Sequence, residues 1–437
     1  MKKINALTFQ NTIQWRIIVL ILLSFARSAY SQDKPVLIKN ATVLSCQDET
    51  IKKTKQDVLI SGGKITAVSK KIKGKKGYVV IEGKGKFLIP GLADMHAHLP
   101  SPGNAINMEQ YLTLQILAGV TYVRSMRGAE DHLQWREKIR NHSTIGPELY
   151  LSPSPIASNT TVSSEDLDAL LKKYKEQGFD FVKLLSLPNK NQFYERLVAA
   201  SLAHGLPIAG HIPNGNLGLA LQNNQQTIEH LQGYTGAIPE ETLLELIRQT
   251  KDRGIYNCPT LDWTFVGSSS QYYSLQNLKN RPGLQYLTEA LKNQWEQTLV
   301  NYLKNVKPDE IEKDRNDLES HFNVLRKMRA AKCLMLLSPD ASSVFQVPGF
   351  GLVEEMKLFA RAGYTAEEIF RIATINPAML MKREKEMGKI ETGYNANLVL
   401  LDGNPLDNLD NYQKINGVMI KGKWHAITDI LTSPNNK

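Results

Sequence analysis

One short segment of the chain contains two histidines that could bind a single metal ion. His96 and His98 end an apolar run that begins at Phe87 and is interrupted by Pro90-Gly91. On a β-strand, side chains at i and i+2 point to the same face, so both imidazoles can reach one point. A His-x-His pair on a surface strand arises by chance at least as often. The metal-site hypothesis therefore depends on ligands elsewhere in the chain.

Strand-like and helix-like segments alternate through the middle of the chain and would position such ligands. The predicted strands are the segment around His96 and residues 119–124, 148–152, 181–185, 207–211, 227–230, 255–261 and 332–337. Each is followed by helical material, such as 164–177, which begins at a serine and ends before Gly178. This alternation is typical of a (β/α)8 TIM barrel, whose active sites lie at the C-terminal ends of the strands.

Polar residues occur at that same end of five predicted strands. They are His96 and His98 on the first strand, Lys183 on the fourth, His211 on the fifth, His230 on the sixth and Asp340 on the eighth. Lys183 lies in an apolar segment, where an ammonium group loses hydration unless it is partnered or modified. His211 and His230, taken singly, are more often core histidines than ligands. Together the six residues predict a site for zinc or a similar divalent ion.

The two ends of the chain predict a second, smaller domain. Short β-rich segments separated by turns run from 35 to 80, and the same pattern returns at 396–401 and 418–424. We therefore expect an α/β protein with a (β/α)8 barrel at 90–385. A small β-sandwich domain would be formed from both termini, by 32–89 and 386–437.

Residues 1–31 are predicted to be a secretory signal peptide. Basic residues precede the apolar run 17–25, and small residues stand at 29 and 31, the positions that a signal peptidase reads. The apolar run is shorter than the ~20 residues of a transmembrane helix, so an uncleaved anchor is the less favoured alternative. We expect cleavage after Ser31, export to the periplasm or the medium, and no stable membrane insertion afterwards.

Composition and charge exclude several other classes. An apolar content of 42% and a charged content of 22% are typical of a globular protein. The net charge of +10 falls to +6 without the predicted signal, which leaves 49 Lys+Arg against 43 Asp+Glu. The lysine-rich stretch 52–86 has the pattern of a solvated sheet face, and the chain carries no nucleic-acid motif. Cys46, Cys258 and Cys333 are too few and too widely spaced for a disulfide framework.

The chain resembles the amidohydrolase superfamily, in particular its Xaa-Pro dipeptidase and imidazolonepropionase-related members. The resemblance extends from about Pro35 to Trp424. The matching motifs are FLIPGLADMHAH ending at His98, GVTYVR from Gly119, GFDFVKLL from Gly178, IAGH ending at His211, IEH ending at His230, LSPDAS around Asp340, and ATINPA…GYNANLVLLDGNP from Ala373.

The resemblance implies a centre of two divalent ions, with zinc expected, that acts on a small-molecule substrate. By match of motif, His96, His98 and Asp340 hold one ion, His211 and His230 hold the other, and Lys183 bridges them. Because an ammonium group has no lone pair, Lys183 must be carboxylated by CO2 to a carbamate. The resemblance also implies a bridging hydroxide as nucleophile, with Asp340 as general base and then general acid to the leaving nitrogen.

Two loops depart from the pattern of the family. Relatives usually carry Gly-Thr-Asp on the last strand, whereas this chain has Ser338-Pro339-Asp340, and the proline removes a backbone donor. Dipeptidase-like members often have a histidine after the third strand, but 153–161 contains none. If that histidine helps to bind a substrate carboxylate, its absence weakens the assignment to dipeptides.

Two further features have more than one interpretation. Tyr234, four residues after His230, is a candidate substrate contact, and core packing explains it equally well. The mostly helical segment 272–329 follows the seventh strand on the active-site side. It is consistent with a lid, with a contact in a homo-oligomer, or with a decoration that has no catalytic role.

We therefore predict an exported, metal-dependent amidohydrolase that cleaves the C–N bond of an amide or peptide in a small substrate, such as a dipeptide or an N-acyl amino acid. The alternative enzyme is a lactonase or deaminase of a cyclic substrate, because one scaffold can host many reactions. A non-catalytic binding protein on the same scaffold is the third hypothesis. It is disfavoured because all six ligands are present.

Overall fold

The computed structural model describes residues 34–47, 50–157, 160, 162–163, 166–187, 191–268, 275–305 and 307–432. The predicted signal peptide, 1–31, lies outside the described residues, as do parts of the segments 153–161 and 272–329. Across the described part of the chain, every helix is too short or too polar to cross a membrane.

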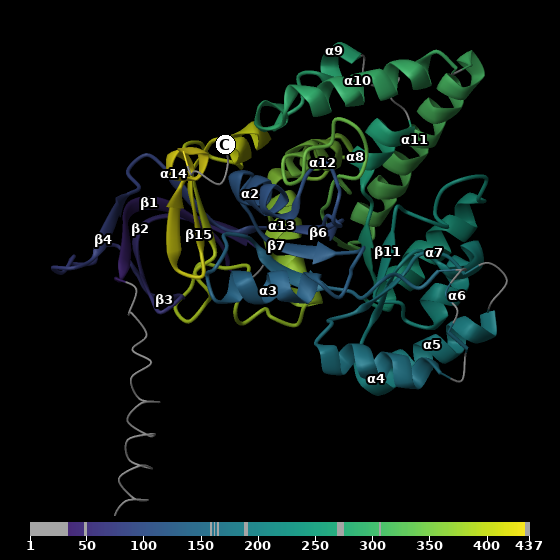
Figure 1. Cartoon of the computed structure of the whole chain (residues 1–437), viewed down its shortest axis with the longest axis horizontal. Helices are drawn as coiled ribbons and strands as arrows, with labels where there is room; N and C mark the ends of the chain where they lie inside the picture. Colours follow the sequence, from purple (N-terminus) through teal and green to yellow (C-terminus); the bar gives the residue numbers. More distant parts are fainter. Residues whose placement is uncertain are drawn as a thin grey trace, which may run out of the picture.

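Eight parallel strands alternate with helices through the middle of the chain (Figure 1). The strands are β6 (Leu92–Ala97), β7 (Val120–Ser125), β8 (Glu148–Leu151), β9 (Val182–Leu184), β10 (Ile208–Gly210), β11 (Thr227–Glu229), β12 (Tyr256–Cys258) and β13 (Leu334–Met335). They occur at the eight segments predicted from the sequence. The predicted α/β class is confirmed.

The helices follow their strands in the expected order. They are α2 (Met108–Leu117), α3 (His132–Arg140), α4 (Leu167–Gln177), α5 (Asn191–His204), α6 (Leu217–Gln222), α7 (Glu240–Asp252), α8 (Leu261–Trp263), α9 (Leu275–Leu278), α10 (Glu289–Leu303), α11 (Pro308–Ala330), α12 (Gly351–Arg361) and α13 (Ala366–Leu380). In α7, Leu243, Ile247 and Thr250 are buried at helical spacing, so one face packs on the strands. Gly178 ends α4 with φ +92°, as its position predicts.

The parallel strands form two hydrogen-bonded sheets, and the prediction of one closed barrel is corrected accordingly. One sheet has the order β13-β12-β11-β10-β9, and the other has the order β6-β7-β8. A few backbone contacts join them. On one side these are a bridge between Ile156 and Leu184 and a 2.8 Å hydrogen bond from the Asp180 N–H to the Leu151 carbonyl, and on the other a 3.1 Å hydrogen bond from the Met95 N–H to the Leu337 carbonyl. Pro153 and Pro155 follow β8 and have no N–H to donate, which limits its pairing with β9.

Strands from both ends of the chain share a third sheet. Its order is β16-β15-β14-β5-β1-β2-β3, with β4 paired to β1. The strands are β1 (Val36–Gln47), β2 (Thr50–Ser61), β3 (Lys64–Ser69), β4 (Val79–Glu82), β5 (Phe87–Pro90), β14 (Leu398–Leu401), β15 (Ile415–Ile420) and β16 (Lys423–Ala426). The final short helix, α14 (Ile427–Thr432), follows β16. β5 pairs antiparallel with β14, so the N-terminal strand that leads to the histidines is fixed by a C-terminal one.

The passage from this sheet into the barrel requires a glycine. Gly91 joins β5 directly to β6, and a Cβ atom at this position would lie 1.9 Å from Thr121 Oγ1 on β7. A side chain at this position would therefore force β6 away from β7. The close approach sets the position of β6, and with it the position of the two histidines at its end.

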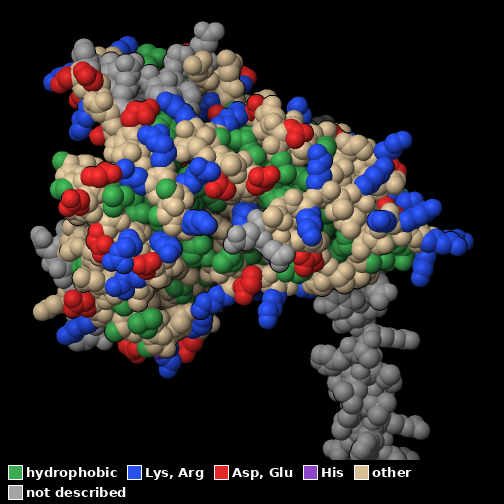
Figure 2. All heavy atoms as spheres, turned by 180° about the vertical axis from the view of Figure 1, so that it is seen from behind, with side chains coloured by type: hydrophobic (Ala, Val, Ile, Leu, Met, Phe, Trp, Pro, Cys, Tyr) green, Lys and Arg blue, Asp and Glu red, His purple; other side chains and the backbone are tan. Residues whose placement is uncertain are grey.

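The lysines of the N-terminal sheet face solvent. Lys52, Lys53 and Lys55 on β2 are exposed, as are most lysines between 64 and 84. In Figure 2, Lys and Arg side chains gather at the end of the molecule where β1 to β4 lie, and elsewhere on that face they alternate with Asp and Glu. This arrangement is that of a solvated sheet edge.

Candidate metal centre

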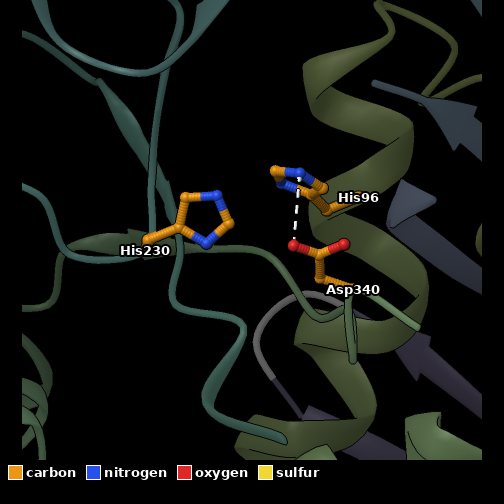
Figure 3. A group of neighbouring side chains, drawn as sticks. All are labelled: His96, His230 and Asp340. Carbon is orange, nitrogen blue, oxygen red and sulfur yellow. Dashed lines mark ion pairs between the residues drawn. The ribbon is translucent and has the colours of Figure 1, made fainter. Parts of the chain in front are cut away.

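His96 and His98 face Asp340 at the C-terminal end of β6. His96 is 1% exposed, and its Nε2 lies 3.8 Å from Asp340 Oδ2 (Figure 3). His98 Nε2 lies 3.5 Å from Asp340 Oδ1. Two ligands of one tetrahedral zinc ion, each bonded at about 2.0–2.1 Å, lie about 3.3–3.4 Å apart. The three side chains are therefore close to the spacing that a shared ion requires.

The other two histidines complete the cluster. His230 follows β11, and its ring centroid lies 4.8 Å from that of His96 and 5.0 Å from that of His211. Ligand atoms of His96, His230 and Asp340 all lie within 4.8 Å of one another. In Figure 3 the His230 ring points toward the other two side chains. His230 Nδ1 lies 2.6 Å from Thr260 Oγ1, so a hydrogen bond holds the ring with Nε2 directed away from it.

Lys183 lies on β9 and is 2% exposed. Among the described residues, its Nζ has no hydrogen-bond partner. A Cβ at Gly210 would lie 2.7 Å from Lys183 Cδ, so the glycine on the neighbouring strand leaves room for the lysine stem. Burial lowers the pKa of Lys183 to about 8. More of the amine is then neutral near pH 7, and the neutral amine is the form that reacts with CO2.

Asp340 is 4% exposed, and its Oδ1 lacks a hydrogen-bond partner within the described residues. Burial raises the pKa of its carboxyl group to about 7. The Asp340 N–H donates to Ser338 Oγ at 3.3 Å, and that hydroxyl in turn donates to Asp94 Oδ1 on β6 and lies 3.0 Å from the His96 carbonyl. The serine of the unusual Ser-Pro-Asp sequence therefore connects the aspartate to β6.

The four histidines have the protonation state that metal ligands need. Burial, reinforced by the charge of Lys183, lowers the pKa of His98 to about 3 and that of His211 to about 4. Burial also lowers the pKa of His96 and of His230 well below the ordinary value. All four rings are therefore neutral at pH 7, with lone pairs free for an ion. Together with the unpartnered Lys183 Nζ and Asp340 Oδ1, they fit a divalent metal centre.

The sequence analysis missed a buried carboxylate behind His96. Glu229 is fully buried, and its Oε2 lies 2.7 Å from His96 Nδ1. Its Oε1 accepts a 2.8 Å hydrogen bond from Arg124 Nη2 and another from the Thr227 hydroxyl. The Arg124 Nε–H in turn donates to the Met95 carbonyl at 2.6 Å. A glutamate directly before His230, at the end of a predicted strand, was the signal that could have identified it.

Tyr234, the candidate substrate contact, lies in the core of the protein. This side chain is 1% exposed, and its hydroxyl lies 2.6 Å from Thr250 Oγ1 on α7. Leu231 at φ +52° and Gly233 at φ +80° turn the backbone after β11, which sends Tyr234 into the core. Of the two interpretations that the sequence left open for Tyr234, the structure favours core packing.

Two cavities open beside the cluster. One, of about 570 Å³, is lined by His211 and His230, with Leu187, Gln232 and Thr235. The other, of about 480 Å³, lies beside His98 and is lined in part by α10. The predicted ligands thus face spaces large enough for a small substrate.

Comparison with known proteins gives a consistent result. The model of the amidohydrolase family matches residues 87–425. The dihydroorotase of Thermus aquaticus is 27% identical over 261 residues, which cover 58% of this chain and 58% of that protein. The dihydroorotase of Carboxydothermus hydrogenoformans is 47% identical over 68 residues, covering 16% of this chain and 15% of that protein. The chain thus aligns with only part of the length of these curated relatives.

Solved structures share the whole architecture at low sequence identity. A Xaa-Pro dipeptidase with bound methionine in its active site has a TM-score of 0.69 at 17% identity, covering 90% of this chain and 100% of that one. The bottromycin amidohydrolase has a TM-score of 0.72 at 19% identity, covering 92% and 89%. These neighbours support the fold, and the family match covers most of the sequence. The chain belongs to the amidohydrolase family.

Proposed function

We propose that this chain is an exported metal-dependent hydrolase that cleaves the C–N bond of an amide or peptide in a small substrate. The observation that carries the proposal is the cluster of His96, His230 and Asp340, with His98, His211 and Lys183 around it. The match to the amidohydrolase family supports the same reaction class. Dipeptides and N-acyl amino acids are the substrates that we propose first.

By match to the family motifs, five of the six side chains divide into two sets, with Lys183 between them. His96, His98 and Asp340 would hold one divalent ion, zinc being expected, and His211 and His230 would hold the second. A carboxylated Lys183 would supply an oxygen to each. When bound, such ions polarise a substrate carbonyl and make water acidic near neutral pH.

Asp340 is the residue that we propose to move the proton. Because its pKa lies near 7, the carboxylate can accept a proton from the attacking water and then release it. Asp340 Oδ1, which has no hydrogen-bond partner among the described residues, is the oxygen available for that transfer. The leaving nitrogen would receive the proton as the C–N bond breaks.

Hydrolysis of a cyclic substrate is the second candidate, favoured by the similarity to dihydroorotases.

A substrate panel tests the reaction class. The mature protein, beginning at Gln32 and loaded with zinc or manganese, is expected to hydrolyse at least one dipeptide or N-acyl amino acid. Cyclic amides and lactones complete the panel and separate the two candidate reactions. Amines freed from amides are detected by derivatisation, and the hydroxy acids formed from lactones are detected by mass spectrometry. Absence of hydrolysis across the panel, with well under one ion bound per chain, would refute the proposal.

Removal of the proposed bridge tests the role of Lys183. We expect Lys183→Ala to lose at least half of the bound metal and nearly all activity, because no other side chain on β9 can supply a shared oxygen. Wild-type protein incubated with 13C-bicarbonate should show a carbamate signal in its 13C NMR spectrum, and the variant should not. Lys332→Ala, at an exposed position, is the control. Unchanged metal content and activity in Lys183→Ala would contradict the assignment.

Glu229 offers a test of the group behind the first ligand. In Glu229→Gln a neutral amide replaces the carboxylate. The hydrogen bond that orients the His96 ring is then weaker. Changes of this kind typically weaken metal binding about 10–100-fold, which competition with a chelator measures. Glu245→Gln, on the exposed face of α7, is the matched control. A folded Glu229→Gln variant, verified by circular dichroism, with unchanged metal affinity would disprove this role.

A further inference from the structure

The cavity beside His98 contains one cationic side chain that the metal centre does not use. Arg127 lies two residues after the end of β7 and lines this cavity together with His98. Its side chain is exposed, and it forms no ion pair with any described residue. None of the residues that line the cavity in the described structure is an aspartate or a glutamate. An anionic group entering the cavity would therefore meet a guanidinium that has no competing carboxylate.

The neighbouring arginine cannot play this part. Arg124 is fully buried, and it is committed to Glu229 and to the Met95 carbonyl. In the cavity lined by His211 and His230, the described lining includes no lysine or arginine. Among the described residues that line these two cavities, Arg127 is thus the one lysine or arginine.

Part of the lining of the same cavity is apolar. Leu291 and Trp295 lie one helical turn apart on α10 and both line it. The Trp295 ring packs against Phe345, with ring centroids 5.9 Å apart, which fixes its position. Part of the helical segment that follows β12 therefore lines the cavity, on a different element from the one that precedes Arg127.

Building on the proposed function, we infer that Arg127 binds a carboxylate of the substrate while Leu291 and Trp295 bind an adjoining apolar side chain. A guanidinium presents parallel N–H donors that match the two oxygens of a carboxylate. Because His98 lines the same cavity, a ligand held in this way has its amide bond next to the metal centre. The substrate class is then an N-acyl amino acid or dipeptide with a free carboxylate and a hydrophobic C-terminal residue.

A pair of substrates that differ only in the carboxylate tests the inference. N-acetyl-leucine and N-(3-methylbutyl)acetamide contain the same scissile amide, and the second lacks the carboxylate. We expect the wild type to prefer the first by about tenfold or more in kcat/KM, the scale of one charge-assisted hydrogen bond at an accessible site. Arg127→Gln should remove the preference. Arg140→Gln, an exposed arginine paired with Glu137 on α3, is the control and should keep it.

A binding measurement separates this inference from the hydrolase proposal. Calorimetry should show that 4-methylpentanoate binds wild type more tightly than 4-methylpentanamide, and that Arg127→Gln weakens carboxylate binding about tenfold. If neither amide is hydrolysed but this binding difference is found, the reaction proposal fails for these substrates and the role of Arg127 stands. Equal kcat/KM values for the two amides in wild type, or unchanged carboxylate binding in Arg127→Gln, would overturn the inference alone.

Discussion

The candidate site depends on one buried carboxylate, that of Glu229. A charge so deeply buried costs several kcal/mol unless it is paired and hydrogen-bonded. Here Arg124 and the Thr227 hydroxyl satisfy one oxygen, and His96 Nδ1 meets the other. The same contacts fix the His96 ring, so that its Nε2 faces Asp340. The contacts that pair the buried Glu229 carboxylate therefore also orient the first metal ligand.

The backbone turns sharply after three of the strands that position the site. His230, Thr260 and Asp340 follow β11, β12 and β13, and have φ values of +60°, +50° and +46°. Non-glycine residues in this region cost about 1–3 kcal/mol each, so surrounding contacts must hold them there. Glu355 on α12 accepts the backbone N–H groups of Leu261 and Asp262, directly after Thr260. The strained strand ends thus coincide with the residues that form the site.

Much of the site could be predicted from the sequence because its determinants are local. The alternation of side chains on a strand brings His96 and His98 to one side, and a lysine in an apolar strand indicated an unusual environment for Lys183. Glu229 was missed because its role depends on Arg124, about a hundred residues away in the chain. The two interpretations of Tyr234 could not be separated from the sequence, because they depend on the positive-φ residues that turn the chain after His230. The break between the two parallel sheets depends on hydrogen bonding between strands. Short strands and prolines limit this pairing, and the periodicity of apolar residues in the sequence does not show it.

The central claim is that these six residues hold two divalent ions, with Lys183 carboxylated between them. Anomalous diffraction at the zinc absorption edge, from crystals of zinc-loaded protein, tests it most directly. The account predicts two peaks: one at bonding distance, about 2.0–2.1 Å, from His96, His98 and Asp340, and one at the same distance from His211 and His230. Electron density should extend beyond Lys183 Nζ toward both peaks. Absence of anomalous density at these side chains, or density for an unmodified lysine between two ions, would contradict it.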